Sequence, residues 1–296
     1  MKQPPLSGKK VFGRGRETLW RRLHLIPGIP VFILAVIAFA TIFGSYITPY
    51  GPNVGNLYNQ FIPPCWMEGG STEHLLGTDY FGRDMLSRLI VGARISLSVS
   101  LITVSIAGTL GTLLGLISGY AGGKTDTVIM RVVDSWLAFP IILLAILFAV
   151  VFRASYSSVI IILVLCVWPR YTRLVRGEAL AIKEQDYVAL ARVAGASPFR
   201  IMLKHIFPNV LPTVLVLVTF QIAEVIMLES LLSFLGVGIP PPTASWGSMT
   251  ADGRDYIATL WWLSAIPGLA IFLTVLSTNL LGDWIRDRLD PKLRVV

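Results

Sequence analysis

The fold of this chain is decided by the stretch EALAIKEQDYVALARVAGASPFRIMLKHIFP, residues 178–208, which is polar and lies between two apolar runs. Its first half is rich in Ala, Leu, Glu, Lys and Arg, which are strong helix formers. Gly195 is typical of a helix stop, because glycine adopts the left-handed conformation at low cost. Ser197 then fits a helix N-cap, and Pro198 fits the first helical position. The stretch therefore predicts a helix, a turn and a second helix that ends at a membrane boundary near Pro208.

This predicted hairpin enters an apolar run at each end with almost no linker. That position argues against a DNA-binding helix-turn-helix, and so does the mixture of acidic and basic side chains in and around the hairpin. An inert loop would not need so much helix-forming sequence. We interpret the hairpin as a docking surface for a soluble partner protein.

The composition is that of an integral membrane protein. The chain has 296 residues, of which 54% are hydrophobic and 14% charged, whereas a soluble domain is about 25% charged. Six runs are long enough, or nearly so, to cross a hydrocarbon core that requires about 20 residues. These predicted spans are residues 25–47, 95–120, 128–152, 155–169, 210–235 and 257–282. We therefore predict an all-α integral membrane fold with six transmembrane helices, the short fourth one extended by snorkelling arginines.

The basic residues predict the orientation of these helices. With the N terminus inside, 20 of the 25 Lys and Arg residues fall on the cytoplasmic side, as the positive-inside rule requires. Both termini and the hairpin are then cytoplasmic. The net charge of +8 is accordingly a topology signal, and we expect no nucleic-acid partner. The expected divisions are a basic cytoplasmic tail 1–24, a first helix with an extracytoplasmic segment 25–94, a five-helix core 95–282 that contains the hairpin, and a cytoplasmic tail 283–296.

One face of the second predicted span carries three glycines. Gly111, Gly115 and Gly119 lie at i, i+4 and i+8, which forms two overlapping G-x-x-x-G patterns. Such a face lets a neighbouring helix backbone approach closely. We predict a tight helix contact there, either within one subunit or between subunits.

Charged residues inside the predicted spans are costly, at roughly 2.5–3.5 kcal/mol each near a helix centre. Arg131 and Asp134 are three residues apart, and we expect them to pair. Glu224 and Glu229 are five apart, or about 140° around a helix. Either glutamate could line a polar translocation path or form hydrogen bonds between helices.

Outside the spans, Asp84 and Arg88 have the i, i+4 spacing of a favourable ion pair, and we expect them on a short outside helix.

The hairpin resembles the EAA loop of ABC importer permeases, in which an alanine triplet is followed by a glycine and, thirteen residues later, by a proline. Here Ala189-Leu-Ala191 corresponds to the triplet, with Ala189 in place of the glutamate of the pattern. Gly195 and Pro208 match, while His205 replaces the isoleucine of the pattern. Three longer stretches resemble the C-type permease subunit of dipeptide, oligopeptide and nickel importers: LGTDYFGRDMLSRLIVGARISL (76–97), LSFLGVGIPPPTASWGSM (232–249) and NLLGDWIRDRLDP (279–291).

This resemblance implies a type I ABC importer permease fold in a bacterial plasma (inner) membrane. It implies a homologous second permease subunit, two ABC ATPase subunits and an extracytoplasmic substrate-binding protein as partners, besides membrane lipid. The ATPase subunits would bind ATP and Mg, and this chain would need no cofactor. Carried over to this chain, the ATPase-coupling residues are Ala189, Ala191, Gly195, Ala196, Ser197 and Pro208. The expected substrates are dipeptides or oligopeptides, with nickel chelates, glutathione and sugars as alternatives.

Two other classes of protein are alternatives to an importer permease. An ion-driven secondary transporter would use Glu224 or Asp134 as a proton relay. A membrane-embedded enzyme is disfavoured, because the three histidines lack metal-ligand spacing and no serine–histidine pairing is visible. The stretch GYAGGKT, residues 119–125, is not a phosphate-binding loop. Such a loop has four residues between its first glycine and Gly-Lys, whereas this stretch has three. We therefore expect no catalytic residue, no metal site and no ATP hydrolysis in this chain.

Overall fold

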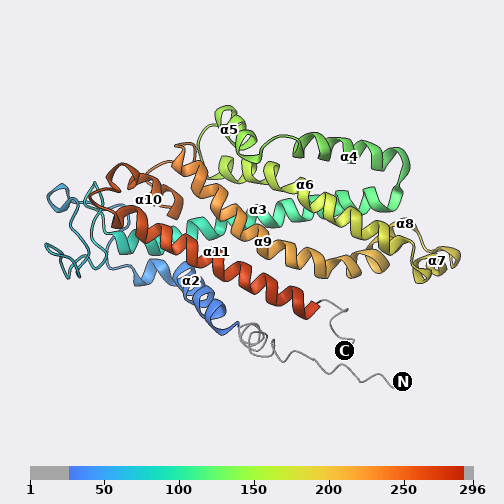
Figure 1. Ribbon diagram of the computed structural model, residues 1–296, viewed down its shortest axis with the longest axis horizontal. Helices are drawn as coiled ribbons and strands as arrows, with labels where there is room; N and C mark the ends of the chain where they lie inside the picture. Colours follow the sequence, from blue (N-terminus) through green and yellow to red (C-terminus); the bar gives the residue numbers. More distant parts are fainter. Residues whose placement is uncertain (1–26, 290–296) are drawn as a thin grey trace, which may run out of the picture.

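The computed structural model describes residues 27–289, so the predicted tail 1–24 and residues 290–296 lie outside the described part. Within that part the regular elements are helices, and the four with 28 residues or more run roughly along the longest axis of the molecule (Figure 1). The long helices are α2 Gly28–Ile47, α3 Met85–Ala121, α4 Gly123–Leu137, α5 Ile141–Val151, α6 Tyr156–Lys183, α9 Phe207–Phe234 and α11 Trp262–Leu289. The short ones are η1 Leu57–Asn59, α7 Asp186–Val193, α8 Pro198–Ile201, η2 Met202–Ile206, α10 Trp246–Asp252 and η3 Arg254–Tyr256. The all-α prediction is confirmed.

Among residues 27–289, five helical stretches are long and apolar enough to cross a membrane, and α4 with α5 supplies a sixth if this bent pair counts as one span. The third predicted span, 128–152, is therefore wrong as a single straight helix. α4 and α5 meet at an angle of 90°. The break falls at Pro140, which has no N–H to donate and disfavours helical backbone at Phe139 before it.

Helix α3 is longer than the second predicted span. Its N-cap is Asp84, whose side chain accepts a hydrogen bond from the Ser87 N–H at 2.7 Å. From there the helix runs without a break for 37 residues, or about 55 Å at 1.5 Å per residue. The short outside helix expected around Asp84 is thus the first turns of the span itself.

Two further spans differ from their predicted limits. α6 does not end near residue 169 but continues to Lys183, with Pro169 inside it. α11 begins at Trp262 rather than at residue 257 and extends beyond residue 282 to Leu289. In both helices the polar segment after the apolar run stays helical, so hydropathy alone misplaces the ends.

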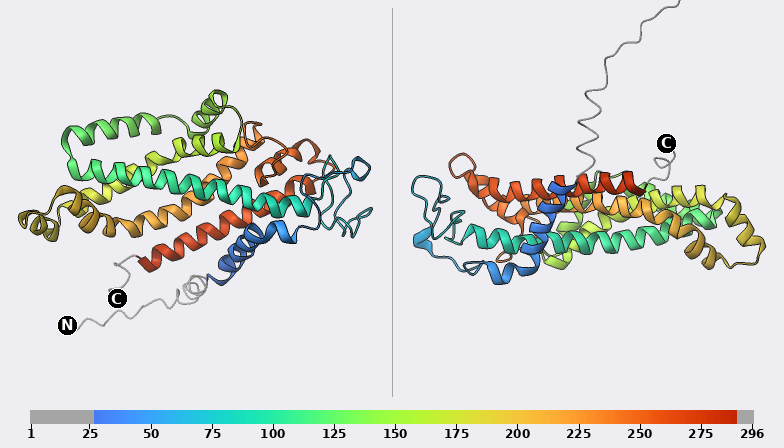
Figure 2. Two further views of the ribbon diagram at one scale, coloured as in Figure 1. Left: turned by 180° about the vertical axis from the view of Figure 1, so that it is seen from behind. Right: turned by 90° about the horizontal axis from the view of Figure 1, so that it is seen from below.

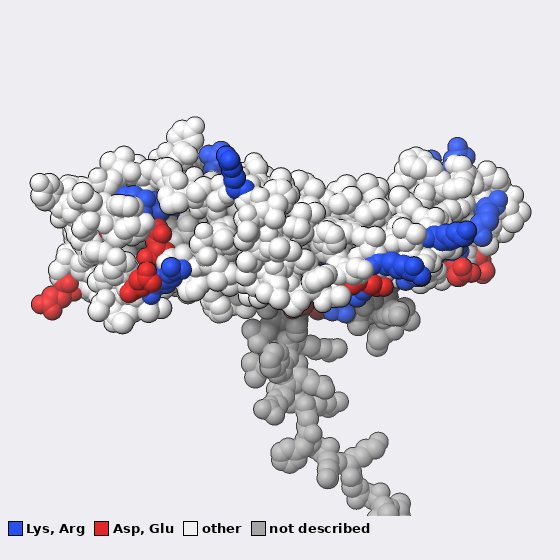
Figure 3. All heavy atoms as spheres, turned by 90° about the horizontal axis from the view of Figure 1, so that it is seen from above, with Lys and Arg blue, Asp and Glu red and all other residues white. Residues whose placement is uncertain are grey.

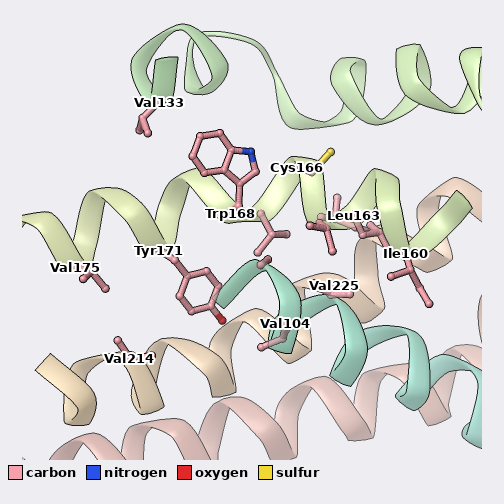
Figure 4. Packing of buried hydrophobic residues seen from close by; sticks show 14 of the residues in the cluster. Val104, Val133, Ile160, Leu163, Cys166, Trp168, Tyr171, Val175, Val214 and Val225 are labelled. Carbon is pink, nitrogen blue, oxygen red and sulfur yellow. The ribbon is translucent and has the colours of Figure 1, made fainter. Parts of the chain in front are cut away.

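The glycine face of α3 packs directly against α6. A Cβ atom added to Gly111 would lie 2.6 Å from the Trp168 carbonyl oxygen, and one added to Gly115 would lie 2.7 Å from the Thr172 carbonyl oxygen. The predicted close helix contact is confirmed, and it lies within one subunit. Figure 4 shows the surrounding core, where Tyr171 and Trp168 of α6 project from the helix among the buried side chains of its neighbours.

Helix α2 lies at the edge of the bundle and packs against α3 and α11 (Figure 2). Only Pro30 and Gly44 of this helix are buried, so most of its apolar side chains face outward. An apolar helix surface of this kind is covered by lipid in a membrane protein, because water would not solvate it.

The two ends of the bundle differ in architecture (Figure 1). The hairpin end consists of residues 184–207, which contain α7, α8 and η2. The loop end consists of residues 48–84 and 236–261, which contain η1, α10 and η3. By the distribution of Lys and Arg residues, we predict that the hairpin end faces the cytoplasm.

Candidate functional site

The hairpin turn has the backbone geometry predicted from sequence. Gly195 adopts the left-handed conformation, with φ at +80°. Its N–H donates to the carbonyl of Arg192 at 3.1 Å, and the N–H of Ala196 donates to the carbonyl of Ala191 at 3.1 Å. These two hydrogen bonds form a Schellman motif, which satisfies carbonyl groups that a helix end would otherwise leave unpaired.

The start of the second hairpin helix is also as predicted. Ser197 is the N-cap of α8 and its hydroxyl accepts a hydrogen bond from the Arg200 N–H at 3.4 Å, while Pro198 occupies the first turn. The capping fixes the direction in which the chain leaves the turn. The hairpin is therefore a defined structure rather than a loose loop.

Two details of the hairpin were predicted wrongly. Its first helix does not run from Glu178 without interruption, because α6 ends at Lys183 and α7 begins only at Asp186. Its second helix does not end before Pro208. Instead α8, the π-helical turn η2 and α9 form one 37-residue helical stretch, Pro198–Phe234. The hairpin and the fifth predicted span thus share one rod, about 55 Å long.

The hairpin exposes large apolar side chains at its surface. Leu190 is 69% exposed, Val193 87% and Phe199 67%; we call these three side chains the hairpin patch. Beneath the patch, Val188 and Ile201 are fully buried and belong to the main core. Lys and Arg side chains gather at this end of the molecule (Figure 3). An exposed apolar patch on an anchored scaffold, beside basic residues, is typical of a protein-docking surface.

The predicted coupling residues other than Pro208 lie in the hairpin, and Pro208 is in the first turn of α9. Ala189, Gly195, Ser197 and Pro208 are exposed, whereas Ala191 and Ala196 are half-buried. The sequence analysis did not single out the hairpin patch itself. The signal was present, since Leu190 and Val193 are three residues apart on α7 and therefore share a face.

Glu224 and Glu229 occupy different environments on α9. Glu224 accepts hydrogen bonds from Arg170 and from the Gln221 amide, and it lines a hollow of about 640 Å³ whose wall is mainly apolar. A second hollow of about 600 Å³ opens between α6, α9 and α11 toward the hairpin end, and Phe220 borders both hollows. Of the two predicted path residues, Glu224 is thus the one that faces open space.

Glu229 is fully buried near the loop end of α9. The hydroxyls of Ser245 and Ser233 donate to its Oε1 at 2.8 and 3.0 Å. Ser245 is the N-cap of α10, so the glutamate ties this short helix to α9. This is a hydrogen bond between helices, which was the alternative to the path interpretation.

The predicted pairing of Arg131 with Asp134 is wrong. Asp134 pairs with Arg173 of α6. Asp126 pairs with Arg176, which lies about one turn further along α6. The Arg176 Nε and Nη2 atoms contact the two carboxylate oxygens of Asp126 at 2.5 and 2.6 Å. These ion pairs attach α4 to α6, a connection between distant residues that local spacing cannot predict.

The predicted Asp84–Arg88 ion pair is also wrong. Asp84 is buried, caps α3 and lies 3.0 Å from Nδ1 of His74. Arg88 instead contacts Asp79 at 3.4 Å and Asp252 at 3.7 Å. Arg83 joins the same group, because its Nε donates to Asp79 at 2.7 Å. Sequence reasoning missed this loop-end cluster, defined here as Asp79, Arg83, Arg88 and Asp252.

Residues 111–295 match the family described as "Binding-protein-dependent transport system inner membrane component". The dipeptide transport system permease protein of Escherichia coli is 44% identical to this chain, over 88% of this chain and 87% of its own length. The di/tripeptide transport system permease protein of Pseudomonas aeruginosa is 40% identical, over 89% and 87% of the two chains.

A solved structure supports the fold. A chain of the MetNI methionine ABC transporter, in an inward-facing conformation, superimposes with a TM-score of 0.60 over 70% of this chain and 98% of its own length. The two sequences are only 18% identical, so this likeness concerns the arrangement of the helices alone.

Proposed function

This chain belongs to the binding-protein-dependent transport system inner membrane component family, and from that premise we propose that it forms part of the pathway by which an ABC importer carries short peptides across the inner membrane. As a member of this family it is a multi-pass permease subunit, and it works with an ATPase and a substrate-binding protein. The finer composition that we propose is a homologous second permease subunit and two ATPase subunits. These subunits bind ATP and Mg, which this chain does not.

The observation that carries the proposed mechanism is the hairpin patch, whose Phe199 lies on the helical stretch that continues into the span of Glu224. A partner that grips Leu190, Val193 and Phe199 moves Pro198, and Pro198 begins the rod that ends at Phe234. Closure of the ATPase subunits on ATP therefore displaces the wall of the Glu224 hollow. Such coupling requires that the partner binds the hairpin differently in the inward-open and outward-open states.

The choice of peptide as substrate rests on the two relatives named above, both of which are named for the transport of short peptides. Nickel chelates, glutathione and sugars are the alternatives. A competition experiment decides between them: we expect excess dipeptide to suppress uptake of a labelled dipeptide, and the other three compounds to leave it unchanged. Suppression by one of those three compounds alone would reassign the substrate.

Co-purification in mild detergent tests the docking surface. We expect the ATPase subunits to be retained by the wild type and lost from Val193→Asp and Phe199→Asp, because a carboxylate would be buried without a partner in the interface. Both side chains are exposed in the free subunit, so folding should be unaffected. Leu57→Asp is the matched control, since Leu57 is 67% exposed at the loop end. Equal retention by all four proteins would refute this docking surface.

A second measurement separates an ABC importer from an ion-driven transporter. In proteoliposomes loaded with ATP and supplied with the binding protein, uptake should continue when a protonophore abolishes the proton gradient. Uptake that stops with the gradient and ignores ATP would favour the ion-driven class. In the same assay Glu224→Gln should lower uptake if Glu224 lines the path, whereas normal uptake with normal assembly would remove it from the path.

A further inference from the structure

A small pocket at the loop end is not used by the coupling mechanism. Its volume is about 220 Å³, and it lies between the loop-end cluster, α10 and the turn at residues 236–243. Its lining includes polar and charged side chains, and the apolar residues Ile239, Pro240 and Pro241. In Figure 3, acidic and basic side chains lie next to one another at this end of the molecule.

The two arginines of this pocket are buried but incompletely paired. Arg83 and Arg88 are 5% and 3% exposed. Both direct Nε toward Asp79, at 2.7 and 3.4 Å, so two guanidinium groups share this one carboxylate. Their Nη2 atoms converge on one oxygen of Asp252 at 3.9 and 3.7 Å, which is too far for a hydrogen bond. The Nη2 atom of Arg83 has no hydrogen-bond partner in the described part of the chain.

Asp252 is a weak counter-ion for these groups. It is the last residue of the seven-residue helix α10, and its side chain is 30% exposed. Burial raises the pKa of its carboxyl, although Arg88 and Arg83 act in the opposite direction. A carboxylate that reached the two Nη2 atoms at hydrogen-bonding distance would therefore satisfy donors that Asp252 leaves open.

The size of the pocket limits what such a carboxylate can belong to. Drug-sized ligands occupy cavities of about 300–1,000 Å³, so 220 Å³ admits only a small molecule or the end of a chain. Planar, bidentate groups such as carboxylates suit the fork of an arginine. The wall of Ile239, Pro240 and Pro241 offers apolar contact to the residue that carries the carboxylate.

We propose that this pocket is a binding subsite for the C-terminal carboxylate of a short peptide, held by Arg83 and Arg88 in place of their loose contacts with Asp252. The proposal rests on the function proposed above, because peptide is the substrate assigned there. The subsite lies at the end of the bundle opposite the hairpin. A peptide would therefore contact it before entering the part of the bundle that the hairpin moves.

The test is a direct binding measurement on the complete importer in lipid nanodiscs, without the binding protein, by saturation-transfer NMR. The probes are dialanine and dialanine amide, which lacks only the terminal carboxylate. We expect dialanine to bind and the amide to bind roughly tenfold more weakly or worse, the scale of a hydrogen bond to a charged group. Arg83→Gln and Arg88→Gln should weaken dialanine binding to the level of the amide.

Because the arginine variants also remove buried ion pairs, a variant that should strengthen dialanine binding is needed as well. Asp252→Asn removes the competing carboxylate and should strengthen dialanine binding by about threefold, the scale of a loose ion pair. Asp255→Asn is the control, because it removes an equal charge from the exposed pair with Arg254 and should leave binding unchanged. A folding defect cannot produce tighter binding, so the gain in Asp252→Asn isolates the subsite.

Two results would overturn the subsite: equal binding of dialanine and its amide, or no gain in Asp252→Asn relative to Asp255→Asn. Absence of any dialanine binding would overturn it as well. None of these results affects the proposed importer function, which is measured separately as ATP-dependent uptake with the binding protein present. Loss of that uptake in the wild type would instead refute the function and leave the pocket as a site for some other carboxylate.

Discussion

The hairpin end and the loop end place apolar and charged side chains in opposite ways. The hairpin end exposes Leu190, Val193 and Phe199, although large apolar side chains are usually buried. The loop end buries Asp79 and Arg83, although charged side chains are usually exposed. The difference shows which interactions the chain supplies itself. The charged side chains at the loop end pair mainly with one another, whereas the hairpin patch has no partner among the described residues.

The comparison predicts that removing a charge from the loop end harms folding. Asp79→Ala would leave Arg83 and Arg88 buried without the carboxylate that both contact. Breaking a buried ion pair of this kind costs about 3–5 kcal/mol. We expect a large fall in the unfolding midpoint of the purified protein in detergent.

The matched change at an exposed site should have little effect. Asp255→Ala removes a carboxylate from a pair in which Asp255 is 77% exposed and Arg254 46% exposed. Exposed pairs contribute between zero and about 1 kcal/mol. If Asp79→Ala and Asp255→Ala shifted the midpoint equally, the loop end would not be held by its buried charges.

A second prediction concerns the packing of α3 against α6, between the two ends of the bundle. Gly115→Ala places a Cβ atom 2.7 Å from the Thr172 carbonyl oxygen and from Val175, and overpacking of this kind costs about 1–3 kcal/mol. Gly268→Ala in α11 is the control, because no atom lies within 4 Å of the added Cβ. Thermal unfolding should show a loss for the first variant and no loss for the second. A neutral Gly115→Ala would mean that α3 and α6 separate easily.

At the hairpin turn we expect a modest effect on stability together with a large effect on transport. Gly195→Val forces a β-branched residue to φ +80°, a strain of about 1–3 kcal/mol. The strained turn shifts the hairpin away from its docking geometry, so ATP-driven uptake per subunit in the membrane should fall by roughly tenfold or more.

The control for backbone strain alone is Gly123→Val. Gly123 also has a positive φ, +54°, and it is the first residue of α4. No atom of the described residues lies within 4 Å of a Cβ added there. Uptake should stay near the wild-type value in this variant. Equal loss of uptake in both variants, or normal uptake in Gly195→Val, would contradict a specific coupling role for the hairpin.

The parts of the fold that sequence predicts are those that depend on local chemistry. Apolar runs of about 20 residues identify spans because each must match the hydrocarbon thickness. The turn at Gly195 and the cap at Ser197 were predicted because both involve hydrogen bonds within a few residues. The break at Pro140 was missed because averaging over an apolar run hides a single proline, although the proline itself was the available signal.

The remainder depends on contacts between residues that are distant in sequence. Arg88 is in α3 and Asp252 in α10, and nothing near either residue indicates that they meet. The same holds for Asp134 of α4 and Arg173 of α6. Spacing rules favour ion-pair partners three or four residues away. Here each of these side chains pairs instead with a residue that is distant in the sequence. The hairpin could therefore be predicted in outline, whereas the pocket at the loop end required the structure.

The π-helical turn Met202–Ile206 has a consequence for how the importer can diversify. A π turn holds one residue more than the α-helical path that it replaces, and one residue corresponds to about 100° of rotation around the helix. Gain or loss of a single residue there would rotate α8 and its Phe199 relative to α9, while the buried face of the span stays in register. The hairpin of such a permease can thus be fitted to differently shaped ATPase subunits by inserting or deleting one residue, without other changes in the membrane-spanning helices.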